Sequence, residues 1–421
     1  MAELKRSLSL LEITLMSVGI ILGAGIYVVI GEAAGLSGNS IWLSFIIAAI
    51  VATFTGLSYA ELSSRYPEAG AEYVYVENAF GSQLAWLTGW LIIIASVIGS
   101  ATVAIGFSRY FSSLFNTPLL IVSFAVLIVV GLILLIGVQE TASLTILFMI
   151  IEAAGLILVI FIGLPYLGTV DYLSMANGFK GVIEAGVLIF FGYLGFEGIT
   201  RLAEETEHPE KTIPKAIVYS LAITTIFYIL VGIAAISVIP WQELASAQAP
   251  LSLVAEQLLG DYSFTILSVI ALFSTFNTAL VMLLSGSRLL YGISKKGGLP
   301  KLFEKVSKKR QTPWIAILAI TLFSMVFLLI EDLSTVTNLT NFAIFCVFIL
   351  VNASLIYYRV KGKESSGFKV PLNIGKIPLI PCLGIITSVG MMANLQLNVL
   401  VMGIALLLVG LLIGYLKDRK A

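Results

Sequence analysis

The chain has 421 residues, of which 59% are hydrophobic and 11% are charged, and its formal net charge is zero. No water-soluble fold carries that much apolar surface, so the composition excludes a soluble protein. A bilayer core is about 30 Å thick and a spanning helix needs about 20 mostly apolar residues, a length that this sequence offers repeatedly.

Twelve apolar stretches separated by short polar segments predict twelve membrane-spanning helices. In chain order they cover residues 10–33, 40–62, 84–113, 118–137, 142–166, 182–204, 214–238, 262–294, 313–331, 335–358, 377–395 and 397–416. Residues 63–82 form a polar and aromatic link that is too charged to span, and residues 241–260 are expected to form a short helix over one mouth. The sequence therefore predicts an all-α integral membrane protein.

The basic residues indicate how the chain is oriented in the membrane. An even number of spans puts both chain ends on the same side. The loops on that side hold nearly all Lys and Arg, including the run from Lys295 to Arg310, whereas the opposite loops hold essentially Arg109 and Lys180. Because basic loops stay in the cytoplasm, we expect a multi-pass plasma-membrane protein with both termini cytoplasmic. The same rule explains the basic run without a nucleic-acid partner.

Two of the predicted spans are unusually rich in glycine. These are the first, with Gly19, Gly23, Gly25 and Gly31, and the sixth, with Gly192, Gly195 and Gly198. Glycine costs up to about 1 kcal/mol relative to alanine inside a helix, but it lets the backbone turn and approach a ligand. Glycines also serve close helix packing, so each span alone leaves both interpretations open. Interrupted helices five apart nevertheless match an inverted-repeat transporter, whose half-helix ends suit a zwitterion.

Six longer motifs make the chain similar to a known family. They read "GIILGAGIYVVIG", "YAELSSRYPEAGAEYVYVENAFG", "GWLIIIAS", "FFGYLGFEGITRLAEETEHPEKTIPKAI", "GSRLLYGISKKGGLPKLFEKVSKKRQTPW" and "FKVPLNIGKIPLIPCLG". In order and spacing they resemble the amino acid–polyamine–organocation superfamily of permeases, especially its bacterial and cationic amino acid transporters. The resemblance implies the leucine-transporter fold with broken helices one and six. It also implies inverted repeats at residues 1–166 and 167–360, and two further helices at 361–421.

The resemblance further implies a substrate site at the two breaks. The backbone around Ala24, Gly25 and Ile26 is expected to receive the substrate carboxylate. The carbonyls of Phe191, Gly192 and Leu194 are expected to receive the amino group. The full expected set is Ile21, Gly23, Ala24, Gly25, Ile26, Phe191, Gly192, Tyr193 and Leu194. Phe191 matches an aromatic gate, a role that Tyr193 is expected to share. Glu197 is expected to bond loop amides or to act as a pH-sensitive gate, and we favour the structural role.

Glu152 is an acid within the otherwise apolar stretch "LFMIIEAAGLIL" of the fifth span. An acid at the centre of a membrane helix costs roughly 2.5–3.5 kcal/mol and usually serves a function in the protein interior. On its helix it shares a small, polar face with Thr141, Thr145 and Gly155. Proton-coupled members of the family that this chain resembles carry a lysine at this position. Because this chain has a carboxylate there, a coupling mechanism that uses the lysine cannot be carried over to it.

Several roles for Glu152 remain open. Burial disfavours the ionised form of a carboxylic acid, so we favour a Glu152 that is protonated at rest and exchanges its proton during transport. Alternatively, an ionised Glu152 binds Na⁺ with helix-1 carbonyls and the hydroxyls of Ser274, Thr275 and Thr278. Those hydroxyls could equally make ordinary interhelical hydrogen bonds. Glu152 could also pair with a cationic substrate side chain, or be structural and permanently neutral.

Together these features predict a secondary active transporter, coupling the symport of a zwitterionic amino acid to protons by alternating access. The third span has no acid to hold a cationic side chain, which favours neutral amino acids. The alternatives are an uncoupled or Na⁺-coupled exchanger or symporter, and a non-transporting membrane sensor of amino acids. We find no catalytic constellation and no dinucleotide fingerprint, and the sole histidine, His208, cannot make a metal site alone. The expected partners are therefore an amino acid, H⁺ or Na⁺ and lipid, with no cofactor, no metal and no nucleic acid, and we expect no enzyme.

Overall fold

The computed structural model describes residues 8–67, 71–136, 138–295, 299–307, 310, 312–362 and 367–418. Within these ranges, the side chains of residues 138–146, 201, 202, 204, 205, 417 and 418 are not described. The polar face predicted for Thr141 and Thr145 therefore lies outside the described side chains.

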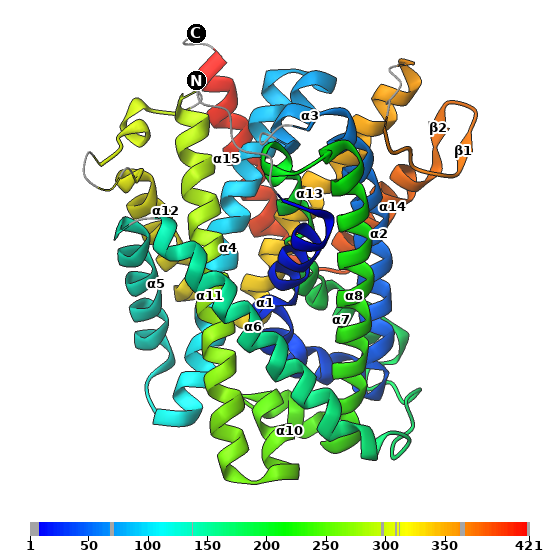
Figure 1. The fold of residues 1–421 in the computed structure, drawn as a ribbon, viewed down its shortest axis with the longest axis vertical. Coiled ribbons are helices and arrows are strands. Elements are labelled where there is room, and N and C mark those ends of the chain that lie inside the picture. The colour runs from blue at the N-terminus through cyan, green and yellow to red at the C-terminus, as the bar shows by residue number, and fades with distance from the viewer. Residues whose placement is uncertain are drawn as a thin grey trace.

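Long helices, many of them running along the long axis of the molecule, make up most of the described chain (Figure 1). They are α1 (Leu10–Ser37), η1 (Gly38–Ser40), α2 (Ile41–Arg65), α3 (Ala71–Phe80), α4 (Ser82–Phe115), α5 (Leu119–Ile136), α6 (Val138–Gly163), η2 (Leu164–Tyr166), α7 (Gly178–Ile189), η3 (Phe190–Tyr193), η4 (Phe196–Glu205), α8 (Pro209–Val238), α9 (Trp241–Ser246), α10 (Pro250–Leu259), α11 (Asp261–Lys295), η5 (Lys301–Glu304), α12 (Trp314–Phe327), η6 (Leu328–Ile330), α13 (Leu333–Val360), α14 (Leu379–Ala393) and α15 (Leu397–Asp418). The strands β1 (Asn373–Ile374) and β2 (Ile377–Pro378) form a short antiparallel hairpin before α14.

The described helices are those of a multi-pass membrane protein. Nine of them are long and apolar enough to cross a bilayer. The first of the nine, Leu10–Arg65, contains both α1 and α2, and Trp314–Ile330 and α14 are shorter apolar helices. The all-α membrane class is thus confirmed. The count of twelve spans is compatible with these helices and stays a prediction.

The segment at residues 241–260 differs from the prediction of one short helix. It forms two helices, α9 and α10, separated by a non-helical link. Pro250 begins α10. A proline has no N–H to donate to a preceding turn, and its fixed φ suits the first turn of a new helix. The proline therefore separates the two helices.

Helix α1 begins with a capping box and is interrupted in its middle. The Ser9 hydroxyl accepts the Glu12 amide, and the Glu12 carboxylate in turn accepts the Ser9 amide at 2.8 Å. Gly23 has φ −8° and ψ −159°, which is not helical. An interruption of this kind leaves amide and carbonyl groups on both sides without intrahelical partners.

A second interruption follows α7. The chain tightens into the 3₁₀ turn η3, Leu194 becomes extended, and Gly195 takes φ +124° before η4 begins. Side chains other than glycine rarely adopt such a φ. A Cβ at this position would also lie 2.6 Å from Cγ2 of Ile20. Gly195 therefore allows both the turn and its close contact with α1.

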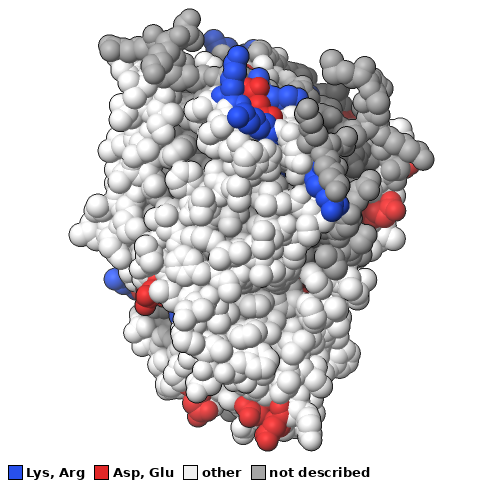
Figure 2. All heavy atoms as spheres, turned by 90° about the vertical axis from the view of Figure 1, so that its left-hand side faces the viewer, with Lys and Arg blue, Asp and Glu red and all other residues white. Residues whose placement is uncertain are grey.

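Charged side chains gather toward the two ends of the molecule. On the face seen in Figure 2, Lys and Arg lie mainly near the top together with some Asp and Glu, and only Asp and Glu lie at the bottom. The charged side chains in between lie toward the left and right edges, and the centre of the face is uncharged. Both ends of the described chain lie in the upper part of Figure 1. Large apolar side chains such as Ile150 and Ile226, at 60% and 58% exposure, fit the hydrocarbon core of a bilayer.

Candidate functional site

The interruption of α1 and the one after α7 lie against each other. A Cβ on Gly25 would approach Cα of Gly192 more closely than real Cβ atoms ever do. The two backbones can therefore meet only because residue 25 is glycine. We call residues 21–25 and 192–195 the break junction. The predicted substrate-binding residues of the first and sixth spans are thus brought together in one place.

The hydroxyl of Tyr228, on α8, bridges the two halves of the break junction. It lies 2.5 Å from the carbonyl oxygen of Ile21 and 2.8 Å from that of Gly192. The ring is fully buried and packs against Phe45 and Tyr193, with centroid distances of 5.6 and 5.3 Å. Sequence reasoning missed Tyr228, because a tyrosine in an apolar helix looks like ordinary packing.

The hydroxyl of Thr278, on α11, meets the break junction from another direction. Its oxygen accepts the Ala24 amide at 2.9 Å, while its proton is donated to the carbonyl of Ser274 at 3.0 Å. A Cβ on Gly23 would lie 2.8 Å from the same oxygen. The predicted ion-site residue Thr278 is thus bonded to the backbone that was predicted to hold the substrate carboxylate.

Glu152 is completely buried in α6. Among the described residues, neither of its carboxylate oxygens has a hydrogen-bond partner. Its backbone carbonyl accepts the hydroxyl of Tyr27 at 2.9 Å. The phenol groups of Tyr27 and Tyr228 lie close enough to interact with the acid electrostatically. An ionised carboxylate in such surroundings carries a large desolvation cost.

The other two predicted ion-site hydroxyls lie in different settings. Ser274 is next to the Glu152 carboxyl group, and its Oγ has no hydrogen-bond partner within the described chain. Thr275 donates to the carbonyl of Ala271 in its own helix at 2.7 Å, as the packing interpretation expects. Ser274 is therefore the hydroxyl best placed to interact with Glu152.

A cavity of about 330 Å³ adjoins the break junction. It is bounded by α1, α4, α11, α13 and residues 194–198, with single contributions from α2, α3 and α6. Its apolar lining is formed by Met16, Ile20, Ile92, Ala95, Met149, Leu194, Val281, Met282, Ile344, Val347 and Phe348, and its polar lining includes Glu72, Ser96, Glu197, Asn277, Thr278, Ser285 and Thr340. The cavity therefore offers a mostly apolar space with a few polar groups beside the junction.

The predicted site residues contribute unequally to this cavity. Leu194 is the one member of the substrate set that lines it among the described residues, and Phe191 is buried away from the lining. The gate role of Phe191 stays a prediction. Glu197 lines the cavity and also accepts the Gly195 amide at 2.9 Å. That bond is the kind of loop contact expected of a structural Glu197.

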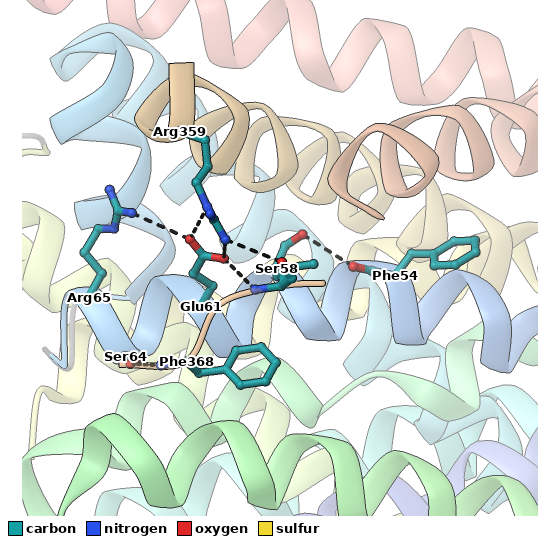
Figure 3. Close-up of polar contacts among 8 residues, drawn as sticks. Phe54, Ser58, Glu61, Ser64, Arg65, Arg359 and Phe368 are labelled. Atoms are coloured by element: carbon teal, nitrogen blue, oxygen red, sulfur yellow. Dashed lines mark hydrogen bonds and ion pairs between the residues drawn. The ribbon is translucent and has the colours of Figure 1, made fainter. Parts of the chain in front are cut away.

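A buried ion-pair network lies at the end of α2 (Figure 3). The carboxylate of Glu61 is fully buried and binds Arg359 of α13 through two hydrogen bonds of 2.7 Å. Arg65 lies 3.6 Å from the same carboxylate, and the Val370 amide donates to it at 2.8 Å. Ser64 accepts the Phe368 amide at 3.0 Å. These contacts fasten α13 and the segment after it to α2. This network was not predicted from the sequence.

Comparison with known proteins identifies the family. A family model described as amino acid permease matches residues 8–414, nearly the whole chain. The chain belongs to the amino acid permease family. The predicted membership of the amino acid–polyamine–organocation superfamily is confirmed.

This permease is similar to the branched-chain amino acid permease BcaP of Bacillus subtilis at 29% identity, covering 99% of this chain and 94% of that protein. It is 28% identical to the methylthioribose transporter of the same organism, with the same coverage of 99% and 94%. It is also 28% identical to the human cystine/glutamate transporter, over 90% of this chain and 79% of that protein. The names of these relatives differ in substrate, so membership of the family leaves the substrate of this permease to the chemistry of its site.

Proposed function

We propose that this permease is a secondary active transporter that carries a zwitterionic amino acid with an apolar side chain together with a proton. The observation that carries the proposal is the backbone contact of the two breaks at Gly25 and Gly192. Backbone leaves the helical path inside a membrane only where protein or a cavity shields it. Half-helix ends that meet in this way attract a carboxylate with their amides and an ammonium with their carbonyls.

The proposal includes the leucine-transporter fold with twelve transmembrane helices and alternating access. Its repeats would be residues 1–166 and 167–360, followed by two helices in 361–421, with both termini in the cytoplasm. The positions of the two interruptions and the basic residues near one end of the molecule support it. Phe191 is the proposed gate over the bound substrate.

The lining of the cavity supports an apolar substrate side chain. Most of its side chains are aliphatic, Met or Phe, and two similar permeases are named for branched-chain amino acids. One relative of equal coverage is named a methylthioribose transporter, so an uncharged substrate is the second candidate. Competition of leucine and methylthioribose for uptake separates the two candidates.

Glu152 is the proposed proton carrier. A neutral, protonated carboxyl group is much cheaper to bury than an ionised one, and Glu152 has no cation beside it in the described chain. The neighbouring Ser274 hydroxyl can accept its proton in a hydrogen bond. Sodium binding at the same residues, and exchange without ion coupling, are the alternatives that the experiment separates.

Glu152→Gln is expected to abolish concentrative, pH-driven uptake. Proteoliposomes with wild-type permease should accumulate labelled leucine when the outside is made acidic. With Glu152→Gln, leucine should reach only the outside concentration, because a glutamine cannot exchange a proton, while leucine–leucine counterflow continues. Initial rates and final levels across pH, with and without Na⁺, measure both properties.

The matched control is Glu184→Gln, which changes a partly exposed acid paired with Lys180 at 3.4 Å and should leave uptake unchanged. Full pH-driven accumulation by Glu152→Gln would contradict the proton role. Uptake that needs Na⁺ at every pH would support sodium coupling, and uptake that needs internal substrate would support exchange. Binding of leucine by the wild type without any flux would instead indicate a sensor.

A further inference from the structure

We propose that the hydroxyls of Tyr228 and Thr278 are internal stand-ins for the two charged ends of the substrate. The two hydroxyls hydrogen-bond to backbone amide and carbonyl groups of the break junction, and the substrate binds by displacing them. The inference rests on the proposed function, since it assumes that a zwitterion binds at the junction.

The hydroxyl of Tyr228 lies at a position where an ammonium group would make more and stronger hydrogen bonds. It faces three carbonyl oxygens, those of Ile21, Gly192 and Leu22, at 2.5, 2.8 and 3.4 Å. A phenol has one proton, so it can satisfy these oxygens only in part. An ammonium has three protons and a positive charge, and its charge-assisted hydrogen bonds are roughly twice as strong as neutral ones. The carbonyls therefore favour an ammonium over the phenol.

The hydroxyl of Thr278 lies at a position where a carboxylate would be the stronger hydrogen-bond acceptor. Because its proton is directed to the carbonyl of Ser274, its oxygen is fixed as an acceptor toward the Ala24 amide. A carboxylate oxygen accepts the same amide with a full negative charge. Thr278 also lines the cavity, so a ligand in the cavity can reach this amide. The amide therefore favours a carboxylate over the hydroxyl.

The two stand-ins together account for a preference among ligands. Without a ligand, they provide hydrogen-bond partners for the buried amide and carbonyl groups of the junction, which would otherwise be left unpaired. A ligand that offers only hydroxyls gains nothing over the groups it displaces. A ligand with both charges replaces two neutral contacts by two charge-assisted ones. The stand-ins therefore select zwitterions against uncharged sugars and alcohols.

The test measures binding of three ligands to the purified full-length permease. The probes are leucine, isoamylamine, which lacks the carboxylate, and isocaproate, which lacks the ammonium. Tyr228→Phe removes a competitor of the ammonium, so it should tighten leucine and isoamylamine roughly fivefold and leave isocaproate unchanged. Thr278→Val should tighten leucine and isocaproate by a similar factor and leave isoamylamine unchanged.

Two further variants control for structural effects. Tyr110→Phe also removes a fully buried tyrosine hydroxyl that donates to an α1 carbonyl, that of Tyr27 at 3.0 Å, but beyond the break. It should leave all three affinities unchanged. Thr278→Ser keeps the hydroxyl and should restore the wild-type affinities. If Tyr228→Phe does not fold, the comparison of Thr278→Val with Thr278→Ser decides the result alone.

Weaker or unchanged leucine binding by Tyr228→Phe and Thr278→Val would overturn the inference, as would equal effects on all three ligands. Those results leave the proposed function standing as long as the wild type binds and transports leucine or another amino acid. Failure of the wild type to bind any amino acid would overturn the proposed function itself, and the inference with it.

Discussion

Gly25→Ala is expected to reduce amino acid uptake roughly 100-fold while the permease remains folded. The added methyl group would meet Cα of Gly192, a backbone atom that cannot turn aside as the end of a side chain can. The two broken helices must then separate, and the amide and carbonyl groups that face the substrate lose their mutual geometry. Initial rates of leucine uptake in proteoliposomes, with gel filtration to check folding, measure the effect.

Gly390→Ala provides the matched control. Gly390 lies in the apolar helix α14, and an added Cβ there would have nothing within 4 Å. Its uptake should equal that of the wild type, because alanine is also the better helix former. Near-normal uptake by Gly25→Ala would show that the close approach of the two breaks is not needed for transport.

Arg359→Ala is expected to lower the free energy of unfolding by about 3–5 kcal/mol. The substitution removes the two shortest contacts of the Glu61 carboxylate, which is fully buried. Within the described chain, Arg65 at 3.6 Å is then its remaining cation. A buried charge that loses its main partner retains its desolvation cost without the compensating attraction. The midpoint of thermal unfolding in detergent, followed by tryptophan fluorescence, measures the change.

Lys180→Ala is the control for this effect. Its pair with Glu184 is exposed, and exposed pairs of this spacing contribute about 0.3–0.5 kcal/mol. The triple variant Glu61→Met, Arg65→Met and Arg359→Leu should recover part of the lost stability, because it removes all three charges of the network. An unfolding midpoint for Arg359→Ala equal to that of Lys180→Ala would contradict the structural role of the network.

Much of the fold follows from the length of the apolar stretches. The predicted spans 84–113 and 262–294 correspond to α4 (Ser82–Phe115) and α11 (Asp261–Lys295). The polar link at 63–82 was not predicted to contain a helix, yet it includes α3. This helix is too short and too polar to be recognised from hydropathy. Its Tyr75 and Val76 are fully buried, so packing against the rest of the protein stabilises this helix.

The sequence predicted the two backbone interruptions of the site but not the side-chain contacts that complete it. Glycine content located both breaks, since few other residues permit such conformations. Thr278 was named for a different role, and Tyr228 was missed, because Tyr228 and its partner Ile21 are separated by 207 positions. The same holds for Glu61 and Arg359, which are 298 positions apart. A hydroxyl or a charge in a sequence does not reveal which distant group it will meet.

The contact between the Ala24 amide and Thr278 spans 254 positions of the chain, and this separation bears on biosynthesis. At about 5–20 residues per second, synthesis of that length takes roughly 10–50 s. Throughout this time α1 is made and α11 is not, while lipid offers no partner for an exposed amide. We therefore expect α1 to enter the membrane as a continuous helix. The break at Gly23 is then expected to form only after α11 has been made.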